Sequence, residues 1–140
     1  MLVACSLQLI NTMIITIGIG LIATLLVLAN YKALRNPKIL VLALLLALGL
    51  TATGISLIMH SKGEKTFYAA FFSPLLAILL LQLSRFLFRR RFGSEIIMYM
   101  YGIYPVRHEE RFVTRLEKTV TFFVTTLSVA IPILLIRLFL

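Results

Sequence analysis

The 140-residue chain lacks aspartate and tryptophan and contains a single cysteine, Cys5. A lone cysteine excludes a disulfide within these residues and a metal site built from several cysteines. Charged residues make up only 14% of the chain, whereas hydrophobic residues make up 61% and the mean hydropathy is +1.04. One small soluble domain cannot bury that much apolar surface, so we expect lipid to cover the remainder.

Acidic residues are scarce, and none of them lies inside a long apolar run. The carboxylates are Glu64, Glu95, Glu109, Glu110 and Glu117. Transport coupled to protons or cations usually places a carboxylate or another ionisable group at membrane depth. The sequence therefore argues against a self-contained proton-coupled exporter of the small four-helix kind.

Four apolar runs are long enough to cross a bilayer, whose hydrocarbon core of about 30 Å requires about 20 helical residues. They cover residues 7–30, 39–59, 66–88 and 119–139. These runs predict an all-α membrane protein in which four transmembrane helices form a bundle. We expect residues 1–140 to make a single integral membrane domain, with an amphipathic cytoplasmic segment at residues 89–118.

The basic residues predict the orientation of these helices, because Lys and Arg concentrate in cytoplasmic loops. The second connection holds only Lys62 and Lys65. The first and third connections hold Lys32, Arg35, Lys38, Arg89, Arg90, Arg91, Arg107, Arg111, Arg115 and Lys118. We therefore expect a multi-pass protein of the plasma membrane, such as a bacterial inner membrane, with both termini outside the cytoplasm.

Small residues recur every four positions along the predicted spans, and this spacing places them on one helix face. Such stripes let helix backbones approach closely inside a membrane. They therefore predict packing within the chain or against a partner. The stripes are Thr12, Thr16, Gly20 and Thr24 in the first span, Ala43, Ala47 and Thr51 in the second, and Ala69, Ser73 and Ala77 in the third.

The segment 89–118 is the largest polar part of the chain, and its basic residues indicate contact with anionic headgroups or a partner. From Glu109 onward we expect a helix that runs into the fourth span, with its basic residues on one face. Arg85 lies close enough to the triple arginine to reach the same headgroups. The expected docking residues are Arg85, Arg89, Arg90, Arg91, Arg111, Arg115 and Lys118.

No catalytic or cofactor motif is evident. His60 and His108 fall on opposite sides of the predicted membrane, and His108-Glu109-Glu110 lacks the second histidine of a zinc-peptidase motif. We predict no cofactor and no metal, and no nucleic-acid partner, since the basic residues flank apolar runs. Gln82 lies one turn from Arg85, and the two could line a pocket for an anionic headgroup.

Three functions remain open from the sequence. The first is a non-enzymatic accessory or scaffold subunit of a larger membrane complex, bound to other membrane subunits or to itself. The second is a small transporter or channel component whose pathway forms on oligomerisation, lined by threonine and amide groups. The third is a lipid-modifying enzyme that uses His108, Glu109 and Glu110 at the headgroup plane.

Overall fold

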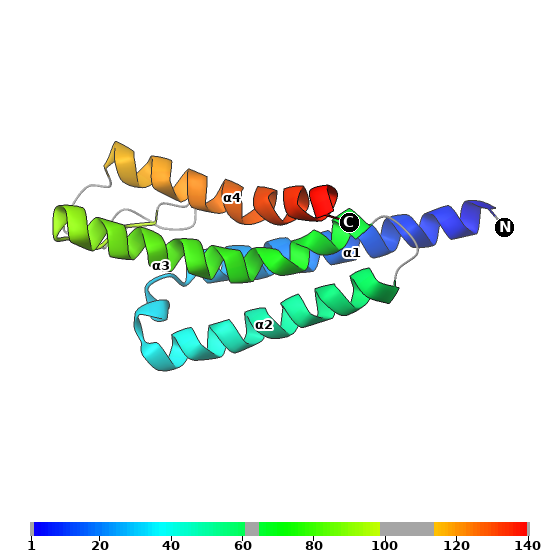
Figure 1. Ribbon diagram of the computed structural model, residues 1–140, viewed down its shortest axis with the longest axis horizontal. Helices are drawn as coiled ribbons and strands as arrows, with labels where there is room; N and C mark the ends of the chain where they lie inside the picture. Colours follow the sequence, from blue (N-terminus) through cyan, green and yellow to red (C-terminus); the bar gives the residue numbers. More distant parts are fainter. Residues whose placement is uncertain (1, 61–64, 99–113, 140) are drawn as a thin grey trace.

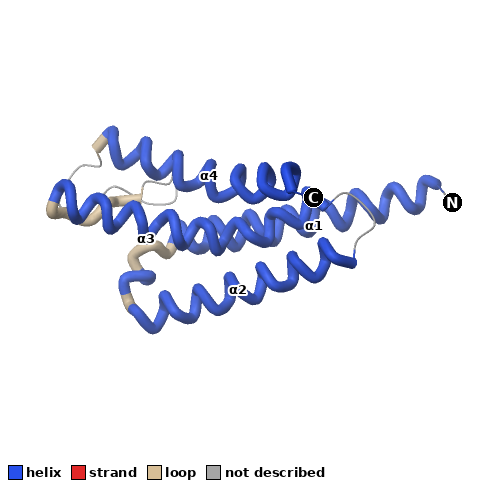
Figure 2. Tube along the Cα trace, viewed as in Figure 1, coloured by secondary structure: helices blue, strands red, loops and turns tan. Residues whose placement is uncertain are grey.

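The computed structural model describes residues 2–60, 65–98 and 114–139, and every regular element among them is helical (Figure 2). The α-helices are α1 (Leu2–Ala29), α2 (Pro37–His60), α3 (Ser73–Phe92) and α4 (Arg115–Phe139), with 3₁₀ helices η1 (Ala33–Arg35) and η2 (Lys65–Phe72). Four helical stretches are long and apolar enough to span a membrane: Ile10–Ala29, Pro37–His60, Lys65–Phe92 and Arg115–Phe139. This supports a multi-pass membrane protein.

The third span differs from the single α-helix expected over residues 66–88. Its first part is the 3₁₀ helix η2, and the α-helix begins only at Ser73. Pro74 explains the change, because proline has no N–H and its ring would clash with the Ala70 carbonyl in a continuous α-helix. Proline is well suited to the first turn of α3, where amide groups have no intrahelical partner.

The end of α3 also differs from the expected boundary. The helix continues through the triple arginine to Phe92, so that Arg89, Arg90 and Arg91 form its last turn rather than a loop. Gly93 then ends the helix in the left-handed conformation with φ 65°, and its N–H donates to the Arg89 carbonyl at 3.0 Å. Glycine adopts this conformation at little cost, which makes it a common helix terminator.

The four α-helices run alternately up and down, and both termini lie at the same end of the molecule (Figure 1). Helix α3 packs against both α1 and α4, while η2 contacts α1, α2 and α4. Gly20 makes one of these contacts close, since a Cβ atom there would lie 2.3 Å from the Ala70 carbonyl oxygen. Helix α2 is inclined away from α1 and α3 toward its Pro37 end.

Candidate functional site

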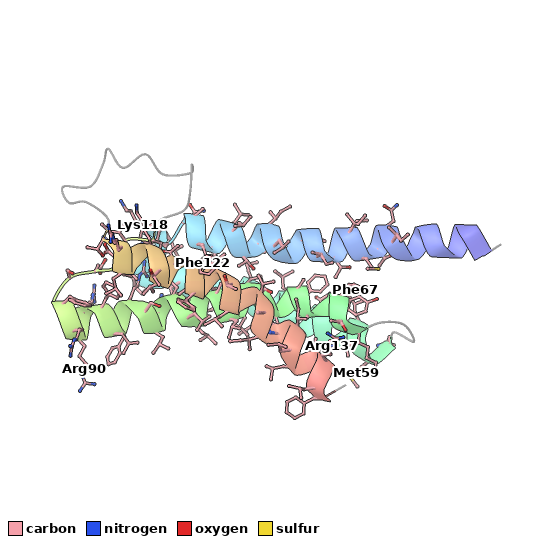
Figure 3. All side chains as sticks on the ribbon, turned by 90° about the horizontal axis from the view of Figure 1, so that it is seen from above. Met59, Phe67, Arg90, Lys118, Phe122 and Arg137 are labelled. Carbon is pink, nitrogen blue, oxygen red and sulfur yellow. The ribbon has the colours of Figure 1, made fainter. Side chains whose placement is uncertain are left out.

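Basic side chains gather at one end of the helices, which we call the basic end. Lys65 and Arg137 lie at the opposite end, and Figure 3 shows Arg137 far from Arg90 and Lys118. The basic end combines the end of α1, the start of α2, the end of α3 and the start of α4. Its basic residues are Lys32, Arg35, Lys38, Arg85, Arg89, Arg90, Arg91, Arg115 and Lys118.

Glu95 ties two of these arginines together. Its Oε2 atom lies 2.5 Å from the Arg35 guanidinium, and its Oε1 accepts a hydrogen bond from Arg89. The exposed fractions of the side chains are 50% for Arg35, 67% for Arg89 and 24% for Glu95. Because Arg35 comes from η1 and Arg89 from α3, the carboxylate links two elements that are distant in the sequence.

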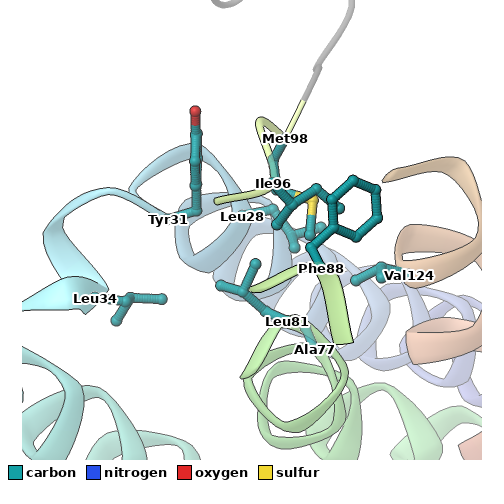
Figure 4. Close-up of a cluster of buried hydrophobic side chains, with 9 residues drawn as sticks. All are labelled: Leu28, Tyr31, Leu34, Ala77, Leu81, Phe88, Ile96, Met98 and Val124. Carbon is teal, nitrogen blue, oxygen red and sulfur yellow. The ribbon is translucent and has the colours of Figure 1, made fainter. Parts of the chain in front are cut away.

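Residues 96–98, which follow Glu95, lie across the ends of the helices. Ile96 and Met98 are each 1% exposed and pack in a hydrophobic cluster with Leu28, Phe88 and Val124 (Figure 4). This cluster joins α1, α3 and α4 directly beneath the basic end. Burial of two large side chains contributes several kcal/mol, at about 1.5–3 kcal/mol for each.

Arg85 is used inside the chain. It is 8% exposed, and its guanidinium donates to the Tyr31 carbonyl just beyond the end of α1. The last carbonyls of a helix lack intrahelical donors and carry partial negative charge, so a cation is well placed there. We expected Arg85 to reach lipid headgroups beside the triple arginine, but the structure turns it toward α1.

Glu117 is a fully buried carboxylate in the first turn of α4. Its Oε2 accepts hydrogen bonds from the Thr114 N–H at 2.9 Å and the Thr114 hydroxyl at 3.0 Å, while the Glu117 N–H donates to that hydroxyl oxygen at 3.2 Å. This reciprocal arrangement is a capping box. The other oxygen, Oε1, accepts the Ile97 N–H at 3.0 Å, so Glu117 also holds the segment that follows α3.

Thr114 lies outside α4, which begins at Arg115. We expected a helix from Glu109 onward that runs into the fourth span, whereas in the described part of the chain this helix begins at Arg115, with Thr114 as its cap. Residues 109–113, and with them Arg111, lie outside the described residues. Of the expected docking residues, Arg89, Arg90, Arg91, Arg115 and Lys118 are exposed at the basic end.

The small-residue stripes lie mostly on packed surfaces of the same chain. In α1, Thr16 and Thr24 are 5% and 1% exposed, Gly20 is buried, and Thr12 is exposed. The third-span stripe is fully packed, with Ala69 and Ala77 at 0% and Ser73 at 1%. In α2, Ala47 is 2% exposed, whereas Ala43 and Thr51 are half-buried.

The buried hydroxyls of α1 and α4 donate within their own helices. Thr16 donates to the Thr12 carbonyl at 2.6 Å, Thr24 to Gly20 at 2.8 Å, and Thr121 to Glu117 at 2.8 Å. Such bonds satisfy a hydroxyl donor without requiring a ligand.

The Gln82 Nε2 atom is buried without a hydrogen-bond partner among the described residues. The described part of the chain contains no group of three His, Cys, Asp or Glu residues that could hold a metal ion. His108 lies outside that part.

Sequence reasoning missed the structural role of Glu95 and Glu117. The Glu117 signal was present, because Thr114-Arg115-Leu116-Glu117 fits the Ser/Thr-x-x-Glu pattern that precedes an apolar helix. Glu95 carried no comparable signal, since its partners lie 60 and 6 positions away in the sequence at Arg35 and Arg89.

Comparisons of the chain with protein-family models, with curated proteins and with solved structures find no match.

Proposed function

We propose that the chain is a non-enzymatic accessory or scaffold subunit of a larger membrane assembly. In this proposal the four spans form a bundle, the basic end faces the cytoplasm, and both termini lie on the other side. The basic end anchors the subunit to anionic headgroups and presents it to a partner. The uneven distribution of basic residues between the two ends is the observation that carries the proposal.

The chemistry of the basic end supports a docking role. Buried Glu117 and partly exposed Glu95 are used in internal contacts, whereas Arg90, Arg91 and Arg115 are exposed. Each basic residue near an anionic membrane surface contributes about 1 kcal/mol, and this contribution is screened by salt. Several such residues at the basic end are enough to attract an acidic surface.

A transporter or channel component is the principal alternative. A polar pathway needs side chains whose hydrogen-bonding groups are available to the transported species. The hydroxyl donors of Thr16, Thr24 and Thr121 are instead engaged by carbonyls of their own helices. This use of the buried hydroxyls favours helix packing, and with it the subunit role.

The first prediction tests docking at the basic end. Replacing Arg115→Gln together with Lys118→Gln removes two exposed charges from the first turn of α4. We expect the amount of co-purified partner protein after gentle detergent extraction to fall several-fold, because two exposed charges are removed and an exposed ion pair contributes roughly 0.2–1 kcal/mol. Quantitative mass spectrometry of the extracts, at equal amounts of inserted protein, measures this change.

The matched control is Lys65→Gln with Arg137→Gln, which removes the same charge from the opposite end. It should leave the co-purified proteins at the wild-type level. The subunit proposal fails if the wild-type chain retains no partner, or if the two double variants lose it equally.

A further inference from the structure

An apolar groove separates the start of α2 from the end of α1. It has a volume of about 680 Å³ and is lined by side chains that include Val27, Leu34, Ala43, Leu46 and Leu50, with Pro74 from α3. This volume is in the range of sites that bind small molecules. Helix α2 leans away from α1 at the groove, as Figure 1 shows.

The groove extends along only part of α2. It runs along α2 from Ile39 to Thr53, which corresponds to roughly 21 Å at the helical rise per residue. Just beyond Thr53, α2 packs closely against η2, since a Cβ atom at Gly54 would lie 2.9 Å from the Phe71 Cβ. A spanning partner helix would need a surface of about 30 Å, whereas one leaflet occupies about half of that thickness.

Basic residues lie near one end of the groove. Lys32, Arg35 and Lys38 are close in the sequence to the lining residues Leu34 and Ile39, and Arg35 pairs with Glu95. Lys32 and Lys38 are exposed. An occupant with an apolar chain and a negatively charged head would match both parts of the site.

We propose that this groove binds one acyl chain of an anionic phospholipid from the leaflet at the basic end, with its headgroup held by Lys32 and Lys38. The inference goes beyond the subunit role. It can be tested on the purified chain without any partner, so that its failure and the failure of the subunit role are distinguishable.

The chain offers two matched variants that separate the groove from the rest of the surface. A Cβ atom at Gly49, which lines the groove, meets nothing within 4 Å, so that Gly49→Leu adds a side chain at the groove from an unobstructed Cβ position. Gly18 in α1 is equally unobstructed but does not line the groove, which makes Gly18→Leu its control. For the headgroup, Lys32→Gln with Lys38→Gln is compared with Lys65→Gln with Arg137→Gln, which removes the same charge at the opposite end.

The experiment is native mass spectrometry of the full chain in mild detergent, with equimolar dioleoyl phosphatidylglycerol and dioleoyl phosphatidylcholine added. We expect the wild type to retain one lipid and to prefer phosphatidylglycerol. The lysine double variant should lose that preference by on the order of tenfold, because two charges near the headgroup are removed. Gly49→Leu should lower occupancy by both lipids, while both control variants should behave as wild type.

Equal retention of the two lipids by the wild type would overturn the proposal, and so would full occupancy in Gly49→Leu. A change in oligomeric mass in Gly49→Leu with unchanged lipid binding would also overturn it, because the groove would then be an interface between protein chains. Size-exclusion chromatography shows whether each variant is folded and monodisperse. The lysine variants change exposed side chains that do not line the groove, so they test the headgroup without narrowing the groove.

Discussion

At the scale of single residues, the two described carboxylates of the basic end serve the fold. Glu95 draws Arg35 and Arg89 together, and Glu117 joins the start of α4 to the segment that follows α3. Glu117 shows that one of the few carboxylates in this chain has a structural role. The sequence suggests a carboxylate in a polar segment, whereas the structure buries it completely in the first turn of a helix.

Replacing Glu117→Ala should lower the free energy of unfolding by about 3 kcal/mol, because the capping box is lost and the Ile97 N–H loses its acceptor. Glu117→Gln should cost about half as much, since its amide oxygen can still accept from Ile97 while its NH₂ group faces the donors of Thr114. Thermal unfolding in detergent, followed by circular dichroism, measures both changes. Thr119→Ala, an exposed position on the same helix, should melt near the wild type; equal melting of Glu117→Ala and the wild type would show that the buried carboxylate is dispensable.

The residue scale also shows where sequence reasoning stops. The grouping of the three arginines at the α3 end is visible in the chain itself, and their docking role stays a prediction. The inward turn of Arg85 was not predicted, because it depends on the Tyr31 carbonyl, which lies 54 positions away. Contacts of this kind arise from the packing of helices, and no local pattern of residue types encodes them.

At the scale of elements, length and apolarity were sufficient to predict four spans, and the confirmed feature is four helices able to cross a membrane. The predicted boundaries missed the 3₁₀ helix η2 and the start of α4. Both differences have local causes, since Pro74 interrupts α-helical bonding and Thr114 caps α4 with Glu117. An apolar run says that a segment is buried or lipid-facing, but it does not distinguish one helix type from another.

The contact between α1 and η2 provides a prediction at this scale. Gly20→Ala places a methyl group 2.3 Å from the Ala70 carbonyl oxygen, so that one backbone has to move. We expect a loss of about 2 kcal/mol in the free energy of unfolding, within the range for overpacked sites. Denaturation in mixed detergent and SDS micelles is a suitable measurement.

Gly18→Ala is the matched control, because its new Cβ atom meets no neighbour within 4 Å. Alanine has the higher helix propensity, so this variant should be as stable as the wild type or slightly more stable. If Gly20→Ala and Gly18→Ala unfold together, the close approach of α1 and η2 does not contribute to stability.

At the scale of the whole molecule, the alternating direction of the four α-helices places both termini at one end (Figure 1) and most of the described basic residues at the other, while Lys65 and Arg137 lie at the end of the termini. On the basis of the positive-inside rule, we propose that the basic end lies in the cytoplasm. Subunit docking and the lipid groove both use this end. The orientation in the membrane is therefore the central claim of the account.

Its most direct test is labelling with a membrane-impermeant thiol reagent in a Cys5→Ser background, with Ala33→Cys and His60→Cys introduced one at a time. Both positions are exposed, and they lie at opposite ends of the apolar helix α2, with Ala33 just before its start and His60 at its last residue. In intact cells we expect His60→Cys to react and Ala33→Cys to react only after the membrane is permeabilised. Labelling of Ala33→Cys in intact cells, with His60→Cys protected, would contradict the proposed orientation.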